Sequence, residues 1–317
     1  MKLIKNIYWD KADITVSIII PIYNRTKTIR RAMISLEKQT SKKFECILID
    51  DGSKDDIDEV IYSFFNKIKL PMLYIKKENG GVHTARNIGI YYARGEYTMF
   101  LDSDDEYRND AIELMIKAWE KIPYEDRGKY REIVAQCQDQ TGNRVGKPFP
   151  VNINKMPWKK AVRLCDSTKG EHVSIMKTCI LKDNPWPEPE GVTFVTEDIV
   201  WKHLEKKYKS FFVNDMIRIY HTNTQDSYTN NKTRTLQYCV NCQWNEGYML
   251  DHWSVYKGKK SYLKSMMIYE IFSKILRKNG VKKGYKFNSI INNIIGGAMC
   301  GVAFIGANIY MQKYDMR

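Results

Sequence analysis

The sequence lacks the two glycine patterns that most often mark phosphate binding in α/β proteins. No Gly-x-x-x-x-Gly-Lys-Ser/Thr loop occurs, and no Gly-x-Gly-x-x-Gly follows the buried strand pattern at 16–20. A diphosphate would therefore not be held chiefly by a glycine loop in this chain. A metal ion bound by acidic side chains would have to hold the diphosphate instead.

Paired cysteines are also scarce. The seven cysteines are scattered, and Cys239-x-x-Cys242 has the spacing of a metal site without a second pair to complete a zinc centre. Core thiols are the simpler interpretation. We therefore expect a reducing cytoplasmic environment.

A long apolar run is missing after the N-terminal lysines, so residues 1–13 do not read as a signal peptide. At the far end, residues 290–310 carry no charge, but they include Asn292, Asn293 and Asn308. This composition is marginal for a membrane span. A helix in the membrane interface and a helix in a protein core are the alternatives.

Acidic residues are outnumbered. Asp and Glu total 37 against 51 Lys and Arg, which leaves a net charge of +14 and predicts an anionic partner: phosphate groups, nucleic acid or an acidic membrane surface. Ten of the basic residues lie between Val255 and Ile290, with Glu270 as the one acid. Solvated lysines are the usual interpretation of such a segment, and an anionic bilayer surface is the other.

The first hundred residues alternate between strand and helix patterns, in a chain whose apolar content of 43% suits a globular core. Such alternation predicts an α/β fold with a mostly parallel sheet flanked by helices. The strand patterns are 16–20, 44–49, 72–75 and 97–101, and the helix patterns are 29–36, 60–65 and 84–93.

The strand pattern at 97–101 stops abruptly in acids. Asp102, Asp104 and Asp105 fall within four residues, and carboxylates this close repel one another unless a cation or hydrogen-bond donors neutralise them. Mg²⁺ and Mn²⁺ take oxygen ligands and bridge to phosphates, so Asp102-x-Asp104 predicts a metal–diphosphate site. A solvated acidic turn or a helix cap is the alternative.

Polar residues follow the other strand patterns too, and parallel strands should bring these ends to one edge of the sheet. Gly80-Gly81 allows the backbone to approach a ligand, and Arg86 can fork onto a phosphate. A plain turn at 50–53 and a surface charge at Arg86 are the alternatives. The residues at these ends are Tyr23, Asn24, Asp50, Asp51, Asn79 and Gly80.

The second half of the chain is harder to interpret. Prolines punctuate 123–191, where we expect loops, short strands and a helix at 158–165. Glu197 and Asp198 stand at a helix start, either as helix-capping acids or with Asp198 as a general base. The strand patterns 211–213 and 216–220 end at His221, which is either structural or a ligand.

Taken in order, five motifs resemble those of family 2 glycosyltransferases, which are inverting enzymes with the GT-A fold. The match is close over 15–105 and extends to 196–201, while the tail after Ser227 lies outside it. The motifs are Ser17-Ile18-Ile19-Ile20-Pro21-Ile22-Tyr23-Asn24, Asp50-Asp51-Gly52-Ser53, Asn79-Gly80-Gly81 with Ala85-Arg86-Asn87-Ile88-Gly89, Leu101-Asp102-Ser103-Asp104-Asp105, and Thr196-Glu197-Asp198.

The resemblance implies a role for each matching residue. Asp51 would accept a hydrogen bond from the base, expected to be uracil, and Arg86 would contact the base or the diphosphate. Asp198 would be the catalytic base, whereas His83 departs from the small residue often found at its position and receives no role. The remaining donor-binding residues would be Pro21, Tyr23, Asn24, Asp50, Asn79, Gly81, Asp102 and Ser103, and the metal ligands would be Asp104, Asp102 and His221.

The resulting prediction is a metal-dependent glycosyltransferase of cell-surface polysaccharide synthesis. It would use Mn²⁺ or Mg²⁺ and a nucleotide-sugar donor, with UDP as the expected nucleotide and a glycan or lipid-linked acceptor. We expect a GT-A domain at 1–226 and a basic helical region at 227–317. The protein would be cytoplasmic, with the inner membrane surface as a further partner.

Two alternatives belong to other classes. A sugar nucleotidylyltransferase needs a Gly- and Arg/Lys-rich loop after its first strand, which Pro21-Ile22-Tyr23-Asn24 does not supply. A non-enzymatic nucleic-acid-binding protein would explain the positive charge. However, the lysines concentrate in the tail and no nucleic-acid-reading motif occurs, so we expect no nucleic acid partner.

Overall fold

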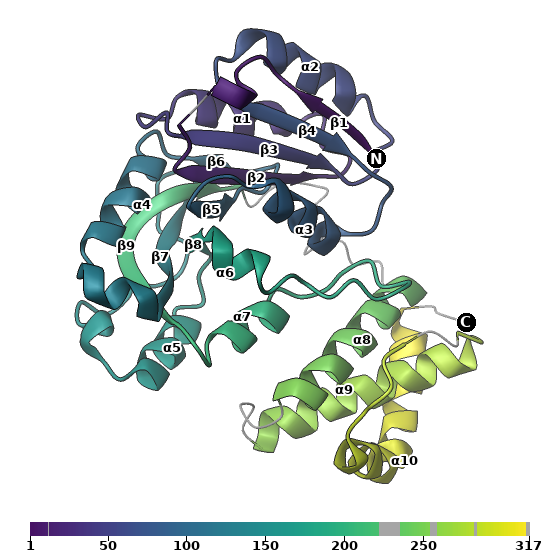
Figure 1. Cartoon of the computed structure of the whole chain (residues 1–317). Coiled ribbons are helices and arrows are strands. Elements are labelled where there is room, and N and C mark those ends of the chain that lie inside the picture. Colours follow the sequence, from purple (N-terminus) through teal and green to yellow (C-terminus); the bar gives the residue numbers. More distant parts are fainter. Residues whose placement is uncertain (12, 222–234, 254–258, 282–283, 315–317) are drawn as a thin grey trace. The chain divides into compact units, whose positions relative to one another are not determined.

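The structure is a computed structural model of the chain, and it describes residues 1–11, 13–221, 235–253, 259–281 and 284–314 (Figure 1). Its contacts define two compact units. The first comprises Met1–Pro185 and His203–Thr224, and the second comprises Trp186–Lys202 and Gln225–Arg317. The predicted boundary between residues 226 and 227 lies outside the described residues and stays a prediction. Residues 186–202, which we predicted in the first domain, group with the C-terminal helices.

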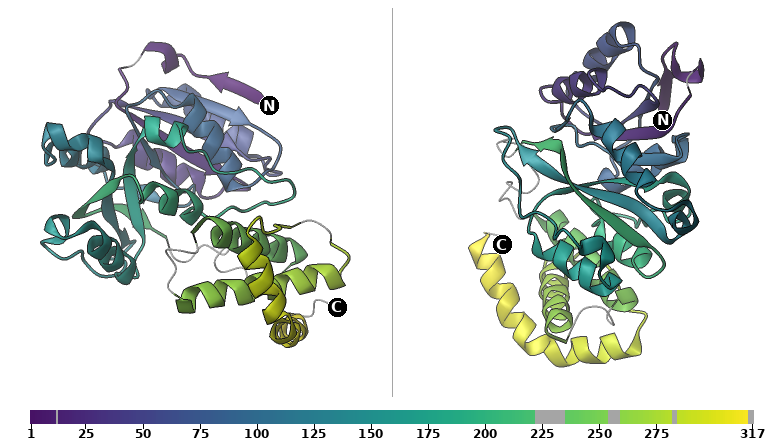
Figure 2. Two further views of the ribbon diagram at one scale, coloured as in Figure 1. Left: turned by 60° about the horizontal axis from the view of Figure 1, so that its bottom comes forward. Right: turned by 90° about the vertical axis from the view of Figure 1, so that its left-hand side faces the viewer.

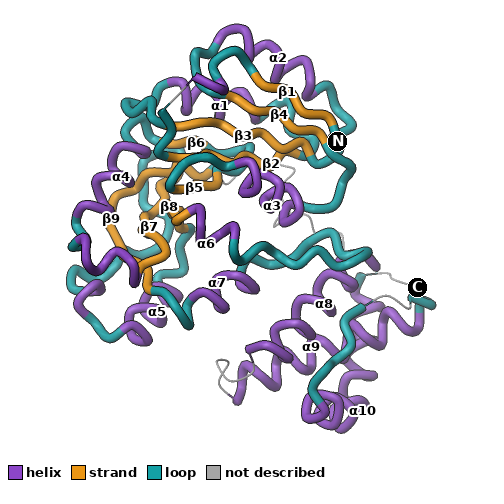
Figure 3. The backbone as a smooth tube through the Cα atoms, viewed as in Figure 1, coloured by secondary structure: helices purple, strands orange, loops and turns teal. Residues whose placement is uncertain are grey.

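Within the described residues, the first unit contains a nine-stranded sheet in the order β1-β4-β3-β2-β5-β8-β7-β9-β6 (Figure 3). The purple strand β1 forms one edge of this sheet (Figure 2). The strands are β1 (Lys2–Lys5), β2 (Val16–Ile22), β3 (Phe44–Asp50), β4 (Met72–Lys76), β5 (Tyr97–Phe100), β6 (Glu106–Tyr107), β7 (Tyr130–Asp139), β8 (His172–Lys177) and β9 (Lys209–Tyr220).

Helices connect these strands and continue into the second unit. The α-helices are α1 (Ile29–Glu37), α2 (Ile57–Lys67), α3 (Val82–Tyr92), α4 (Ala111–Glu120), α5 (Trp158–Ser167), α6 (Thr178–Lys182), α7 (Asp198–Leu204), α8 (Leu236–Trp253), α9 (Lys259–Lys278) and α10 (Ile290–Lys313). Short 3₁₀ helices occur at Trp9–Lys11, Tyr124–Lys129 and Ile153–Lys155.

The predicted parallel part of the sheet is present. β2 pairs in parallel with β3 and β5, and β3 pairs in parallel with β4. The predicted α/β class is therefore confirmed. β7 and β8 lie within 123–191, where the sequence predicts short strands without giving their bounds. β8 runs antiparallel to both β5 and β7, because the chain leaves the βα repeat after β5.

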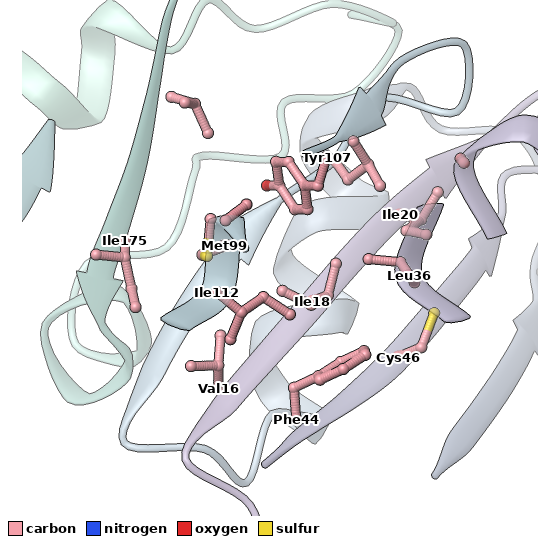
Figure 4. Close-up of a cluster of buried hydrophobic side chains, with 14 of the residues drawn as sticks. Val16, Ile18, Ile20, Leu36, Phe44, Cys46, Met99, Tyr107, Ile112 and Ile175 are labelled. Carbon is pink, nitrogen blue, oxygen red and sulfur yellow. The ribbon is translucent and has the colours of Figure 1, made fainter. Parts of the chain in front are cut away.

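Side chains alternate across the sheet, and each face has its own cover. Ile18 and Ile20 point into the core that α1, α2 and α4 close (Figure 4). On the opposite face Ile19 lies against α3, where a Cβ on Gly89 would come within 2.4 Å of the Ile19 side chain. Gly89 thus lets α3 approach the sheet closely.

The second unit has a separate apolar cluster. Leu250 of α8 packs with Met266 and Tyr269 of α9, and Phe287 and Ile295 add partly buried side chains. The large apolar side chains between residues 266 and 276 are for the most part buried in this unit. The lysines of α9 lie outside that cluster.

Truncation of a core side chain should cost far more than truncation of an exposed one. We expect Ile18→Ala to lower the free energy of unfolding by about 2–5 kcal/mol, because Ile18 is fully buried. Ile7→Ala, at a residue that is 76% exposed, should change it by less than about 0.5 kcal/mol. Urea unfolding followed by circular dichroism measures both, and equal effects would contradict the assignment of this core.

Candidate active site

The loops after β2 and β3 are joined directly. The Asp51 backbone N–H donates to the Ile22 carbonyl at 2.8 Å, and the Asn24 N–H donates to Ser53 Oγ at 2.9 Å. Asn24 adopts a positive φ of 53° and accepts from the Lys54 N–H. Tyr23 stands exposed beside this junction, while Pro21 lies within β2. The predicted residues of the first two strand ends are therefore neighbours.

Asp51 ties these loops to the start of α3. Its two carboxylate oxygens accept from the backbone N–H groups of Gly80 and Gly81 at 2.9 and 2.7 Å. Lys77 Nζ lies 2.5 Å from Asp51 Oδ1, and Asn79 donates to the Asp51 carbonyl. Gly81 has a φ of +96°, which a residue with a side chain rarely adopts. Asp51 thus sets the shape of the loop that the resemblance assigns to the base.

Asp50 faces the other way, because adjacent residues of a strand point to opposite faces. Its side chain is fully buried. Tyr74 Oη donates to Asp50 Oδ2 at 3.1 Å, and Lys76 Nζ lies 3.4 Å from the same oxygen. The structure therefore separates Asp50 from Asp51, and we do not include Asp50 among the residues proposed below to contact a donor.

His83 occupies the first turn of α3 and is 1% exposed. Neither ring nitrogen has a hydrogen-bond partner. Burial lowers the pKa of His83 to about 4, against the opposing charge of Asp51. The ring is therefore neutral at physiological pH, and His83 follows Gly81, whose backbone N–H donates to Asp51, by two residues.

Asp102 lies between two arginines at the carboxyl end of β5. Arg218 Nη1 lies 3.2 Å from Asp102 Oδ2, and Arg86 Nη2 lies 3.9 Å from Oδ1. The Asp102 side chain is 44% exposed, whereas the two arginine side chains are 8% and 10% exposed. A buried guanidinium on each side of a half-exposed carboxylate leaves that carboxylate accessible to a further ligand.

Arg218 is the site residue that the sequence motifs did not identify. Its guanidinium also reaches Asp105 at 3.4 Å and Glu171 at 3.2 Å, so that one cation serves three carboxylates. A signal was present, because a charged residue inside the apolar pattern 216–220 needs a partner once the strand is buried. The partners lie far away in the chain, so the pattern could not name them.

Asp105 is almost fully buried beside Arg218. Burial raises the pKa of Asp105 to about 7, although Arg218 and the His221 backbone N–H act in the opposite direction. The His221 N–H donates to Asp105 Oδ1 at 3.0 Å. Asp105 therefore anchors the end of β9 rather than facing solvent.

The other residues predicted to bind the donor or the metal near this end of β5 are Ser103, Asp104 and His221, and each has different neighbours. Ser103 is buried, and the backbone carbonyl of Asp104 accepts from the guanidinium of Arg31 in α1. His221 Nε2 lies 2.8 Å from Glu106 Oε1. This contact occupies Nε2 and leaves Nδ1 as the ring nitrogen that could bind a metal, so the ligand role of His221 stays a prediction.

The acidic residues after β5 suit a hard divalent ion only if substrate phosphates supply its other ligands. Among the described residues, no three His, Cys, Asp or Glu side chains gather as a metal-binding group. Mg²⁺ is usually held by one or two carboxylates together with substrate phosphates, however. The half-exposed Asp102 and the neighbouring Asp104 fit that smaller set of ligands.

Asp198 begins α7 and is exposed, and the segment before it is clamped to α8 within the second unit. Asn241 Oδ1 accepts from the Thr193 N–H at 3.0 Å, and Asn245 Oδ1 accepts from the Thr196 N–H at 2.9 Å. Both asparagines are buried on one face of α8, four residues apart. The C-terminal region thus fixes the backbone that leads into Asp198.

A cavity of about 490 Å³ lies beside the motif of the β5 end, between α1 and the 106–110 segment. It contains none of the residues predicted to bind the donor. Its lining residues are Ile34, Ser35, Lys38, Glu106, Tyr107, Arg108, Asn109, Asp110 and Ile219.

The sequence model of "Glycosyl transferase family 2" matches residues 17–128. A curated relative is GalNAc(5)-diNAcBac-PP-undecaprenol beta-1,3-glucosyltransferase of Campylobacter jejuni. It is 30% identical over 218 residues, which cover 67% of this chain and 66% of that protein. The chain therefore belongs to glycosyl transferase family 2 through the domain that carries Asp51, Arg86 and Asp102.

Two solved structures share the fold. Staphylococcus aureus TarS residues 1–349, in complex with UDP, aligns with a TM-score of 0.55 and 17% identity, over 95% of this chain and 92% of that one. The mannosyltransferase PcManGT of Pyrobaculum calidifontis, in complex with GDP-Man and Mn²⁺, aligns with a TM-score of 0.53 and 15% identity, over 97% and 86%. The predicted GT-A type of α/β fold is confirmed by this likeness.

The match to other curated bacterial glycosyltransferases is partial. Relatives with 35 to 42% identity align over 101 to 157 residues. The chain spans only 15 to 40% of the length of those proteins. These relatives share the domain, while the activity of the whole chain is a proposal.

The pKa of Asp105 gives a pH test of this site. Its folded value of about 7 lies above its ordinary value of about 4, so the folded chain binds the proton more tightly. Stability from this residue is complete below about pH 4 and is lost as the pH rises through about 7. We therefore expect the stability advantage of the wild type over Asp105→Asn to shrink across that range.

Urea unfolding of the two proteins at a series of pH values measures this difference. A constant difference would contradict the raised pKa. An advantage that grows with pH would show that Asp105 is instead stabilised as the carboxylate by Arg218.

Proposed function

We propose that this chain transfers a sugar from a nucleoside diphosphate donor to an acceptor hydroxyl, with inversion at the sugar carbon. The observation that carries the proposal is the half-exposed Asp102 between the buried Arg86 and Arg218, at the edge where β2 to β5 end. Family membership supports it, as do the neighbours in complex with UDP and with GDP-Man. We expect UDP as the nucleotide.

The donor would lie along the strand ends. Asp51 would accept from the base, because a carboxylate oxygen can accept more than one hydrogen bond and both of its oxygens stay in place beside Gly80 and Gly81. Tyr23 and Asn24 would line the same pocket. Arg86, on α3, would face the diphosphate, and Asp102 with Ser103 would contact the ribose side.

The reaction is a single displacement. The acceptor oxygen attacks the anomeric carbon while the bond from that carbon to the diphosphate oxygen breaks, and the nucleoside diphosphate leaves with the electron pair. Asp198 takes the proton from the attacking hydroxyl. One carboxylate base on the face opposite the leaving group is sufficient, and a positioned base contributes about 10²–10⁴-fold.

The charge of the leaving group needs compensation. The guanidinium groups of Arg86 and Arg218 supply fixed positive charge near Asp102. A divalent ion such as Mn²⁺ or Mg²⁺, held by Asp104 and Asp102, would add Lewis acid stabilisation of the departing diphosphate. A neighbour solved with Mn²⁺ supports this choice of ion.

The acceptor would be a glycan or a lipid-linked glycan in the synthesis of a cell-surface polysaccharide. The name of the Campylobacter jejuni relative, which includes PP-undecaprenol, supports a lipid-linked acceptor. We propose that the reaction takes place in the cytoplasm. None of the seven cysteines, all of which lie in the described residues, forms a disulfide bond, and this suits a reducing compartment.

The direct test is hydrolysis of a panel of nucleotide sugars in the presence of Mn²⁺. We expect one donor class to release a nucleoside diphosphate and free sugar. Cleavage of none of them would contradict the proposal. Consumption of a nucleoside triphosphate with a sugar phosphate would instead assign a nucleotidylyltransferase.

Metal dependence is tested with Asp104→Ala. This variant should lose Mn²⁺-dependent binding of the donor, because it removes a proposed ligand. Asp10→Ala, which removes an exposed acid far from the motif in sequence, is the matched control and should bind the donor as the wild type does. Full wild-type activity in excess chelator would refute the metal assignment.

The role of Asp198 is tested by separating binding from transfer. Asp198→Asn should reduce transfer by about 10²–10⁴-fold and leave the Kd for the donor nearly unchanged. Glu197→Gln, at the exposed neighbour, should retain transfer. Loss of donor binding together with transfer in Asp198→Asn, or a larger loss in Glu197→Gln, would count against Asp198 as the base.

A further inference from the structure

Helix α10 has two unlike faces. One face packs against α9 through small side chains. Gly296, Ala303 and Ala307 are buried there or in close contact, and a Cβ on Gly306 would meet Ile271 of α9 at 2.8 Å. The contact is therefore close, and α10 packs against α9 within the second unit.

The other face is an exposed apolar stripe. Ile294, Val302, Ile305 and Ile309 are 60 to 67% exposed, and they recur at helical spacing. Between Ile294 and Ile309 the exposed positions of α10 carry only aliphatic side chains, glycine and Phe304. By length and composition α10 is the one membrane-span candidate among the described residues, and 22% of its most apolar stretch is buried.

Positive charge borders this stripe. Lys274 of α9 places its Nζ 5.8 Å from the ring centroid of Phe304, at the margin of the exposed face. Lys274 is partly exposed, and Lys264, Lys278 and Lys286 are exposed. An apolar surface with a basic margin is complementary to a bilayer whose headgroups are anionic.

The acids of this region do not offset that charge at the surface. Asp251 accepts from Tyr285 Oη at 2.9 Å and from Asn292 Nδ2 at 2.6 Å. Glu270 is 7% exposed. The lysines therefore dominate the exposed charge of α9 and of the segment that leads into α10.

We propose that the exposed face of α10, defined by Ile294, Val302, Ile305 and Ile309, binds the surface of an anionic lipid bilayer and lies parallel to it. A spanning orientation is disfavoured, because α9 packs along α10 and would take its lysines into the hydrocarbon. A second copy of the chain is a poorer occupant, since pairing two such faces would bring like charges together. The proposal does not depend on sugar transfer.

Sedimentation with vesicles tests the proposal on the full chain. The wild type should bind equimolar phosphatidylcholine–phosphatidylglycerol vesicles about tenfold or more tightly than phosphatidylcholine vesicles, and binding should weaken with salt. The double variant Ile305→Glu/Ile309→Glu should lose binding. Val151→Glu, at a fully exposed apolar residue of the first unit, is the matched control and should bind like the wild type.

A variant at the basic margin separates the two contributions. Lys274→Gln/Lys278→Gln should reduce the preference for phosphatidylglycerol while leaving weak binding to both vesicles. Circular dichroism melting checks that every variant is folded. Equal binding of the wild type and Ile305→Glu/Ile309→Glu would overturn the proposal. So would a wild-type dimer, measured by light scattering without lipid, that this double variant converts to a monomer.

Discussion

One buried guanidinium contacts three acidic side chains at the centre of this site. Arg218 contacts Asp102, Asp105 and Glu171 within 3.4 Å, on a strand that would otherwise be apolar at this depth. Removing one partner of such a cluster leaves an uncompensated buried charge, which is strongly unfavourable. The residues that follow β5 and the end of β9 meet at this cluster, where Asp105 also accepts from the backbone N–H of His221.

The sequence predicts the parallel half of the sheet well, because β2 to β5 are short continuous apolar runs that end in polar residues. It could not separate Asp50 from Asp51, since both stand in the same motif. Only the alternation of the strand sends Asp50 toward Tyr74 and leaves Asp51 at the loop. Roles drawn from a motif therefore need the register of the strand before they can be assigned.

Other features escaped the sequence because they depend on distant contacts. Arg218 meets Asp102 across 116 residues, and no local pattern encodes that pairing. Likewise Asn241 and Asn245 hold the segment before Asp198 from a helix that local patterns place in a separate tail. A boundary at residue 226 assigns the segment and the helix to different domains, because they are far apart in the chain. The hydrogen bonds instead place them in one unit.

The central claim is that Asp51, Arg86 and Asp102 contact one nucleoside diphosphate. A crystal structure of the chain grown with UDP and Mn²⁺ tests it most directly. We predict the base beside Asp51 and the diphosphate beside Arg86 and Asp102. A nucleotide bound elsewhere, with these three side chains left in their present contacts, would contradict the account.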